Sequence, residues 1–180
     1  MQVKVLLLAI MVLPAIANGQ SSFTLFSSDL EGQILESQVL NGFGCEGKNI
    51  SPKLRWENPP QGTKSFAVTV YDPDAPTGSG WWHWIMFDIS SEISELKSNS
   101  GNSTQIAPVG SIQSTTSFGT TGYGGACPPK GDHAHQYIFT VHALKVEHLG
   151  LKSDATPALV GYYLSQNTLA KASMVAYFSR

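Results

Sequence analysis

The hydrophobic residues of this chain fall in short runs separated by Gly, Pro, Ser and Asn, which predicts strands and turns rather than long helices. Residues 65–71 and 84–89 are apolar on both faces, as expected of central strands that are covered on both sides. Residues 136–144 alternate clearly, which places Tyr137 and His142 on opposite faces of a strand. Further strands are expected at residues 23–26, 34–40, 54–56 and 172–178, with a weaker strand or turn at 93–96.

One segment near the end of the chain has helical spacing. Thr156 suits the N-cap position and Pro157 the first position of a helix that continues to about Ala170. The apolar positions of this helix are Leu159, Tyr162, Tyr163 and Leu169. The predicted fold is therefore mainly β: an antiparallel β-sandwich of two sheets with a C-terminal helix and short additional helical turns.

Residues 1–17 differ from the rest of the chain. Lys4 is followed by an apolar run over residues 5–13, which is too short to span a bilayer, and then by small residues at Ala15 and Ala17. This pattern predicts a signal peptide cleaved after Ala17, and hence export to the periplasm or the extracellular medium. A buried N-terminal helix is the alternative interpretation. The remaining residues, 18–180, have a length typical of a single domain.

The charge balance argues against several classes of partner. Without Lys4 the chain carries ten Lys and Arg residues against thirteen Asp and Glu, a net charge near −3. No basic stripe runs through the sequence, so nucleic acid and anionic membrane surfaces are poor candidates. No segment after residue 17 is long and apolar enough to form a transmembrane helix.

The two cysteines, Cys45 and Cys127, each lie in a Gly-rich turn. Export to an oxidising compartment favours a disulfide between them, and two free thiols are the alternative. Closing a loop of about 83 residues would stabilise the fold by roughly 4.5 kcal/mol in the chain-entropy model.

The candidate chemistry lies in two stretches that lead into strands. In the first, residues 72–84, Pro73 and Pro76 stiffen the backbone around Asp72, and three tryptophans surround His83 with flat apolar walls. This combination is more typical of a small-ligand pocket than of a plain turn. In the second, residues 127–137, another proline-stiffened loop leads into a strand through histidine. If these two strand ends meet, two imidazoles, a phenol and a carboxylate converge.

The motifs Asp-Pro-Asp-Ala-Pro followed by His-Trp, Pro-Pro-Lys-Gly, and His-x-Tyr resemble the phosphatidylethanolamine-binding protein family, in particular its exported, bacterial Raf-kinase-inhibitor-like branch. The resemblance covers nearly the whole chain after residue 17. It implies a β-sandwich whose pocket binds phosphate-like anions and phosphoryl head groups, without a cofactor. By motif position, the implied pocket residues are Asp72, Pro76, Trp81, His83, Pro129, His135 and Tyr137.

The chain departs from the family pattern at three positions. Gly78 and Gln136 stand where members often carry Arg, and His133 stands where they often carry Gly. The loss of both arginines removes one anion contact and structural ion pairs that the family pattern implies.

The pocket residues suggest how an anion would be held. His83, His135 and the Tyr137 hydroxyl can donate hydrogen bonds to phosphate, and Asp72 is expected to accept one from a histidine and favour its charged form. Alternatively, Asp72 could meet an ethanolamine ammonium group. Binding of phosphate-type ligands is expected to weaken as pH rises and the histidines lose charge.

Three other functions stay open. A metal site could use His133 and His135 together with His83 and Asp72. A weak hydrolase is disfavoured because the sequence offers no convincing nucleophile. A pure interaction protein that inhibits a kinase or protease is compatible with ligand binding. We expect a ligand-binding protein that modulates a protein partner without catalysis.

Overall fold

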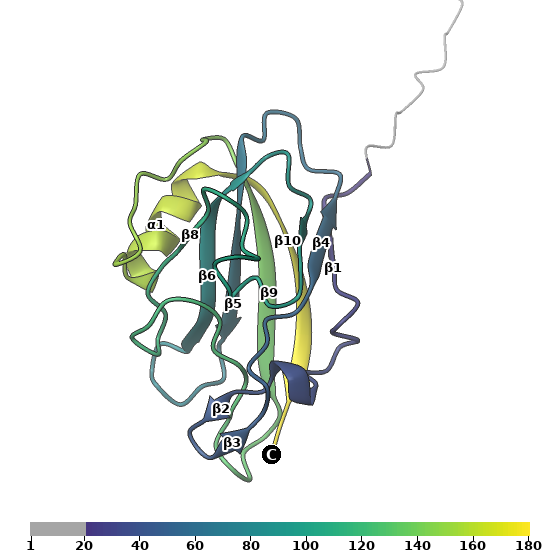
Figure 1. Cartoon of the computed structure of the whole chain (residues 1–180), viewed down its shortest axis with the longest axis vertical. Helices are drawn as coiled ribbons and strands as arrows, with labels where there is room; N and C mark the ends of the chain where they lie inside the picture. The colour runs from purple at the N-terminus through teal and green to yellow at the C-terminus, as the bar shows by residue number, and fades with distance from the viewer. Residues whose placement is uncertain (1–20) are drawn as a thin grey trace, which may run out of the picture.

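The computed structural model describes residues 21–180, so the predicted signal peptide over residues 1–17 lies outside the described residues. A five-stranded sheet forms the centre of the molecule, and each pair of neighbouring strands in it is antiparallel (Figure 1). Its strands, in spatial order, are β10 (Thr168–Phe178), β9 (His135–Leu144), β5 (Ser65–Asp72), β6 (Trp81–Ser90) and β8 (Ile112–Gln113).

A smaller sheet packs against one face of the central sheet, as Figure 1 shows. It contains β1 (Thr24–Phe26), β4 (Leu54–Glu57) and β7 (Glu95–Leu96), again in antiparallel pairs. A third pair, β2 (Asn41–Gly42) and β3 (Cys45–Glu46), forms a short hairpin.

The main hydrophobic core lies between the two larger sheets. Trp56 from β4 packs against Phe66 from β5, with ring centroids 5.1 Å apart, and both side chains are almost fully buried. Tyr137, Phe139 and Val141 of β9 belong to the same core. The predicted antiparallel β-sandwich is confirmed. The prediction that Tyr137 and His142 lie on opposite faces of β9 is confirmed as well.

The opposite face of the central sheet is covered near one end by the helix α1 (Pro157–Asn167), which explains why β5 and β6 are apolar on both faces (Figure 1). The Thr156 side chain accepts a hydrogen bond from the Leu159 backbone N–H, so the predicted N-cap is confirmed. The predicted apolar face is wrong in part: Tyr163 packs against the core as predicted, but Leu159 and Tyr162 are exposed. The buried residues of the helix are Val160 and Leu164.

One predicted strand is absent, and the predicted end of the helix is wrong. Residues 34–40 form a single 3-10 turn, Glu36–Gln38, rather than a strand. The two ends of this segment bond to different partners, Ile34 to Tyr177 and Leu40 to Ala126, so no continuous ladder can form along it. The helix ends at Asn167 instead of continuing to about residue 170, because Thr168 already pairs with Leu144 as the first residue of β10.

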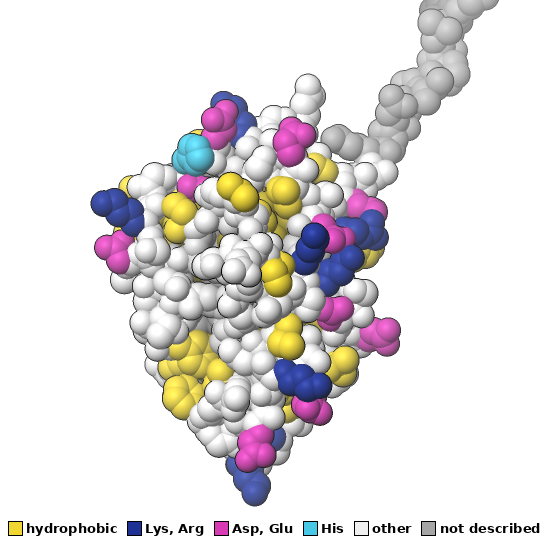
Figure 2. Space-filling view, in the orientation of Figure 1, with side chains coloured by type: hydrophobic (Ala, Val, Ile, Leu, Met, Phe, Trp, Pro, Cys, Tyr) yellow, Lys and Arg dark blue, Asp and Glu magenta, His cyan; other side chains and the backbone are white. Residues whose placement is uncertain are grey.

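No helix within residues 21–180 is long and apolar enough to cross a membrane. On the face shown in Figure 2, Lys and Arg side chains are interspersed with Asp and Glu, and no continuous basic area is visible. Within residues 21–180, three Lys or Arg side chains lie within ion-pair distance of an acidic side chain: Lys48 of Glu36, Lys53 of Glu95, and Arg55 of Glu57.

Candidate ligand-binding site

The topology of the central sheet brings the two candidate stretches together. Strand β5 lies between β6 and β9 and runs antiparallel to both, so the end of β5 lies beside the starts of β6 and β9. Asp72 ends β5 and pairs with Trp81 at the start of β6, while His135 begins β9. Side chains from segments far apart in the sequence therefore meet at one end of the sheet.

A cavity of about 280 Å³ lies at this end of the molecule. All seven residues that the family resemblance implies as pocket residues line it: Asp72, Pro76, Trp81, His83, Pro129, His135 and Tyr137. Apolar side chains complete the wall, among them Leu40, Phe43 and Phe118. The structure thus brings the predicted residues together, and ligand binding by them stays a prediction.

A buried acid–imidazole pair forms the polar side of the cavity. The Nδ1 atom of His135 lies 2.8 Å from Oδ2 of Asp72, and both side chains are at least 97% buried. The other carboxylate oxygen of Asp72 accepts hydrogen bonds from the backbone N–H groups of Asp74 and Ala75. Asp72 therefore faces protein donors and orients His135, as the sequence analysis expected.

Asp74 joins the two halves of the site. Its carboxylate accepts a hydrogen bond of 2.8 Å from the backbone N–H of Gln136, the residue after His135 in β9. Asp74 is not among the pocket residues that the family motifs imply, although it lies in the same proline-stiffened stretch as Asp72.

His83 is buried in a neutral form. Its Nδ1 atom lies 2.8 Å from the carbonyl oxygen of Gly124, and because a carbonyl can only accept, Nδ1 carries the proton. Burial lowers the pKa of His83 to about 4, against smaller raising effects of the Gly124 hydrogen bond and the Asp72 charge. The Nε2 atom of this neutral ring is therefore a hydrogen-bond acceptor rather than the donor to phosphate that the sequence suggested. This Nε2 atom is buried and has no partner in the described protein.

Tyr137 presents a second buried polar atom without a partner. Its side chain is 1% exposed, and its hydroxyl makes no hydrogen bond with the described residues. Burial, followed by the Asp72 charge, raises the pKa of this phenol, so the hydroxyl stays protonated and can donate. Its ring contacts that of His83 edge to face, with centroids 5.1 Å apart.

Only one of the three neighbouring tryptophans lines this cavity. Trp81 does so and packs its ring edge to face against Phe118. Trp82 lies on the opposite face of the sheet, where its ring contacts Tyr71, and Trp84 is fully buried in the core. The prediction of three aromatic pocket walls is therefore corrected to one. Strand alternation turns Trp82 to the opposite face, and the irregular pairing between Val70 and Tyr71 places Trp84 in the main core instead of beside Trp82.

Arg180 lines the cavity and was missed by the sequence analysis. It lies two residues after the end of β10, where Phe178 pairs with His135. Its guanidinium donates hydrogen bonds to the carbonyl oxygens of Pro128, Gly44 and Phe43. This cationic side chain lies at the site although Gly78 and Gln136 lack the arginines of the family pattern. No local motif marks Arg180, because only the pairing of β10 with β9 brings it there.

A disulfide connects Cys45 in β3 to Cys127 in the loop before β9, as predicted, with their Cα atoms 6.0 Å apart. The disulfide covalently links the β2–β3 hairpin to the loop before β9, and both segments border the cavity.

The expected set of metal ligands is corrected by the structure. Within residues 21–180, the group of side chains with ligand atoms close enough to share an ion is Asp132, His133 and His135. Asp72 and His83, which the sequence analysis placed in this set, do not belong to it. His133 also precedes β9 rather than lying on a face of that strand.

The family model described as phosphatidylethanolamine-binding protein matches residues 27–179 of the chain. The chain belongs to the phosphatidylethanolamine-binding protein family. Two family relatives from Escherichia coli K12 are similar over most of their length. The UPF0098 protein YbcL is 51% identical over 148 residues, which cover 81% of this chain and 80% of YbcL. The UPF0098 protein YbhB is 48% identical over 157 residues, which cover 86% of this chain and 99% of YbhB.

Solved structures show the same phosphatidylethanolamine-binding protein fold. The crystal structure of E. coli YbcL, described as a new member of the mammalian PEBP family, superposes with a TM-score of 0.87 and 47% identity, covering 89% of this chain and 99% of that one.

A further relative by sequence, the lipoprotein LppC of Mycobacterium tuberculosis, is 34% identical over 137 residues, which cover 76% of this chain and 63% of LppC.

Proposed function

We propose that this family member is an exported protein that binds a small phosphoryl anion, such as phosphate or a phospholipid head group, and that it modulates a protein partner without catalysis. The observation that carries the proposal is the pair of buried polar atoms without partners, His83 Nε2 and the Tyr137 hydroxyl. Leaving a buried polar atom unsatisfied costs about 1–3 kcal/mol, so such atoms in a cavity are typical of sites that a ligand completes.

The cavity has the size and the charge for a small anion. Its volume of about 280 Å³ is near the lower end of the range for ligand pockets, so it suits a head group better than a large molecule. Arg180 supplies a positive charge at its wall, and the Tyr137 hydroxyl supplies a donor. The carboxylate of Asp72 is already occupied by His135 and two backbone N–H groups, which limits its repulsion of an anion.

The protonation of His83 sets a condition on the ligand. Because Nε2 of the neutral ring accepts, it repels a fully ionised phosphate oxygen and favours an oxygen that carries a proton. A phosphomonoester loses this second proton with a pKa of about 6, so the protonated monoanion is abundant only in mildly acidic solution. Binding is therefore expected to weaken as pH rises, although the proton comes from the ligand rather than from a charged His83.

Calorimetric titration with phosphoethanolamine at pH 5.5 and pH 8 tests this proposal. The expected result is tighter binding at pH 5.5, with a loss of at least tenfold in His83→Phe at that pH. The exposed His148 is the matched control, and His148→Gln is expected to bind as the unchanged protein does. Equal or tighter binding at pH 8 contradicts the proposed role of His83, and no binding at either pH contradicts the proposed ligand class.

Export and partner modulation are parts of the same proposal. The predicted signal peptide, the disulfide between Cys45 and Cys127, and the name of the lipoprotein relative LppC support export. Fractionation of cells that produce the full chain tests it, and mass spectrometry of the purified protein should show a start at Asn18. Kinase and protease assays with and without added protein test the modulation of a partner, and turnover of generic phosphate esters would contradict the absence of catalysis.

A further inference from the structure

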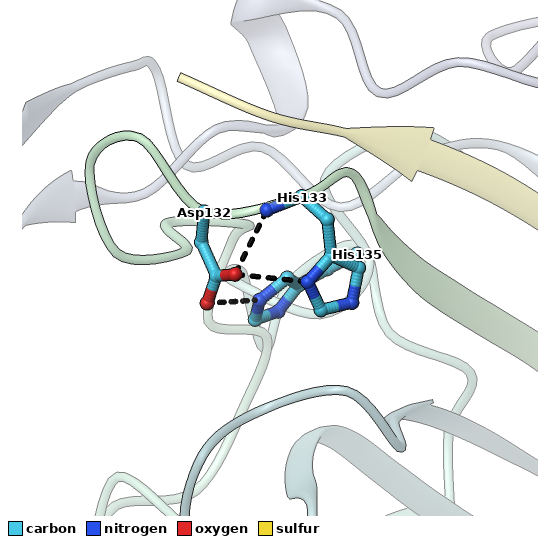
Figure 3. A group of neighbouring side chains, drawn as sticks. All are labelled: Asp132, His133 and His135. Carbon is cyan, nitrogen blue, oxygen red and sulfur yellow. Dashed lines mark hydrogen bonds and ion pairs between the residues drawn. The ribbon is translucent and has the colours of Figure 1, made fainter.

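A cluster of two imidazoles and a carboxylate lies where the loop before β9 enters the strand. Asp132, His133 and His135 each offer a ligand atom, and these atoms all lie within 4.8 Å of one another. Figure 3 shows the Asp132 carboxylate on one side of the two neighbouring rings, with one oxygen directed toward each ring. The Nδ1 atom of His133 lies 2.8 Å from Oδ1 of Asp132, and the Nε2 atom of His135 lies 3.4 Å from Oδ2.

The separation between His135 and Asp132 suits a shared ion. Zinc binds imidazole nitrogen at roughly 2.0–2.1 Å and carboxylate oxygen at roughly 2.0–2.2 Å, so two ligand atoms of a tetrahedral site lie about 3.4 Å apart. The distance of 3.4 Å from His135 Nε2 to Asp132 Oδ2 matches this value. The exposed ring of His133 must move away from Asp132 by a few tenths of an ångström, which its position in the loop permits.

A buried residue already orients the cluster. The Nδ1 atom of His135 is held by the Asp72 carboxylate at 2.8 Å, so its Nε2 atom is directed toward Asp132. A carboxylate that holds the far nitrogen of a histidine is the usual support of a metal-binding imidazole, because it fixes the ring and makes the near nitrogen a better ligand. Asp72 is in turn held by the backbone N–H groups of Asp74 and Ala75.

We infer that Asp132, His133 and His135 form a binding site for a divalent first-row transition metal of the zinc type. Two imidazoles and one carboxylate suit zinc, copper or nickel, whereas magnesium and calcium require sets of oxygen ligands. The His133 side chain is 64% exposed and that of Asp132 34% exposed, so an ion can enter from solvent and keep water in its remaining positions. His133 stands where members of the family often carry Gly, which makes this site a property of the chain rather than of the family pattern.

Titration of the tag-free, chelator-treated protein with Zn²⁺ in phosphate-free buffer tests the inference. One ion per chain is expected to bind with micromolar affinity, and Mg²⁺ is expected not to compete. His133→Gln and Asp132→Asn are each expected to weaken Zn²⁺ binding by at least tenfold, while His148→Gln, another exposed histidine, is expected to leave it unchanged. Because His133 is exposed, its variant should keep the thermal midpoint of the unchanged protein.

Two results would overturn the inference: no binding of one Zn²⁺ per chain at micromolar concentration, or equal binding in His133→Gln. Substitution with Co²⁺ adds an optical readout, since a site with nitrogen and oxygen ligands should give an absorption band that the His133 variant loses. The titration of phosphoethanolamine is carried out in the presence of chelator. Failure of the metal site and failure of phosphoryl binding are thereby distinguished.

Discussion

The Nδ1 atom of His135 lies 2.8 Å from a carboxylate oxygen of Asp72, although the two residues are 63 positions apart in the sequence. Burial disfavours the charged imidazole, but the hydrogen bond and the negative charge of Asp72, together with smaller effects of Asp132, outweigh it and raise the pKa of His135. The pair fixes the end of β5 to the start of β9, so the same contact that stabilises the fold also shapes the cavity.

Replacing Asp72 by Asn should destabilise the protein in a pH-dependent way. A histidine whose pKa is raised by folding contributes stability that is fully present below its unfolded pKa, near 6.5, and is lost as pH rises through its folded pKa. Asp72→Asn is therefore expected to lower the free energy of unfolding by about 2 kcal/mol at pH 5.5 and by less at pH 8.5. Urea denaturation in the presence of chelator measures this difference.

Asp74 supplies the control for that experiment. Its carboxylate bonds to the backbone N–H of Gln136 and to no histidine, so the cost of Asp74→Asn should be similar at both pH values. A cost of Asp72→Asn that does not change between pH 5.5 and 8.5 would contradict the assigned role of the Asp72–His135 pair.

Removing the Tyr137 hydroxyl should weaken ligand binding without destabilising the fold. This buried group has no partner among the described residues, so Tyr137→Phe removes an unsatisfied atom and is expected to keep or raise the free energy of unfolding by about 1 kcal/mol. The same change removes a donor from the cavity and should weaken phosphoethanolamine binding by about tenfold. Calorimetry and urea denaturation measure the two effects, and a destabilised variant with unchanged affinity would show that the hydroxyl is structural.

The free energy of unfolding should fall as the solution becomes acidic. Burial lowers the pKa of His83 to about 4, and burial together with Lys171 lowers that of His142 to about 4. Between pH 6.5 and 4 these histidines take up protons in the unfolded chain but not in the folded one, so stability declines over that interval and levels off below it. The shift of His83 alone corresponds to about 3 kcal/mol.

Denaturation of the unchanged protein and of His83→Gln across this pH range provides the measurement. In His83→Gln the free energy of unfolding should fall less between pH 6.5 and 4 than in the unchanged protein, whereas in His148→Gln it should fall by the same amount. An identical decline in the His83 variant would show that other groups cause it.

Glycine is required at position 80 for two reasons. Gly80 has a φ of +67°, and a Cβ atom there would collide with the Tyr71 side chain and the Asp72 carbonyl. Gly78 has a similar φ of +75° but open space around it. Gly78→Ala should therefore cost about 1 kcal/mol of backbone strain, and Gly80→Ala clearly more because Tyr71 must also move.

Thermal or urea denaturation of the two variants compares these costs directly. The Gly80 variant should also bind phosphoethanolamine more weakly, because Trp81 follows it into the cavity wall. Equal stability of the two variants would contradict the collision at position 80.

Local rules account for the parts of the structure that the sequence predicted correctly. Side-chain periodicity identified the central strands, since a strand covered on both faces must be apolar at successive positions. The helix start at Thr156 and Pro157 followed from backbone preferences that do not depend on the rest of the fold. The seven cavity residues were named through family motifs, and the pairing of two cysteines followed from the number of cysteines and the expected compartment.

The predictions failed where the backbone of a segment pairs with residues distant in the sequence. Residues 34–40 have a strand-like composition, but their ends bond to Tyr177 and Ala126, so the backbone turns between them. The helix stops at Asn167 because β9 offers Thr168 a strand partner. Intrinsic preference is weak compared with such long-range pairing, and nothing in the local sequence reveals it.

The sequence by itself determined which chemical groups are available: the acids, imidazoles, phenol and thiols, and the strand or turn that carries each. Tertiary structure alone decided their protonation states and which residues they contact. Burial makes His83 neutral, sheet order pairs Asp72 with His135, and strand pairing brings Arg180 to the cavity. The physical reason is that protonation and hydrogen bonding depend on solvent exclusion and on neighbours within a few ångströms, and both are set by contacts between residues far apart along the chain.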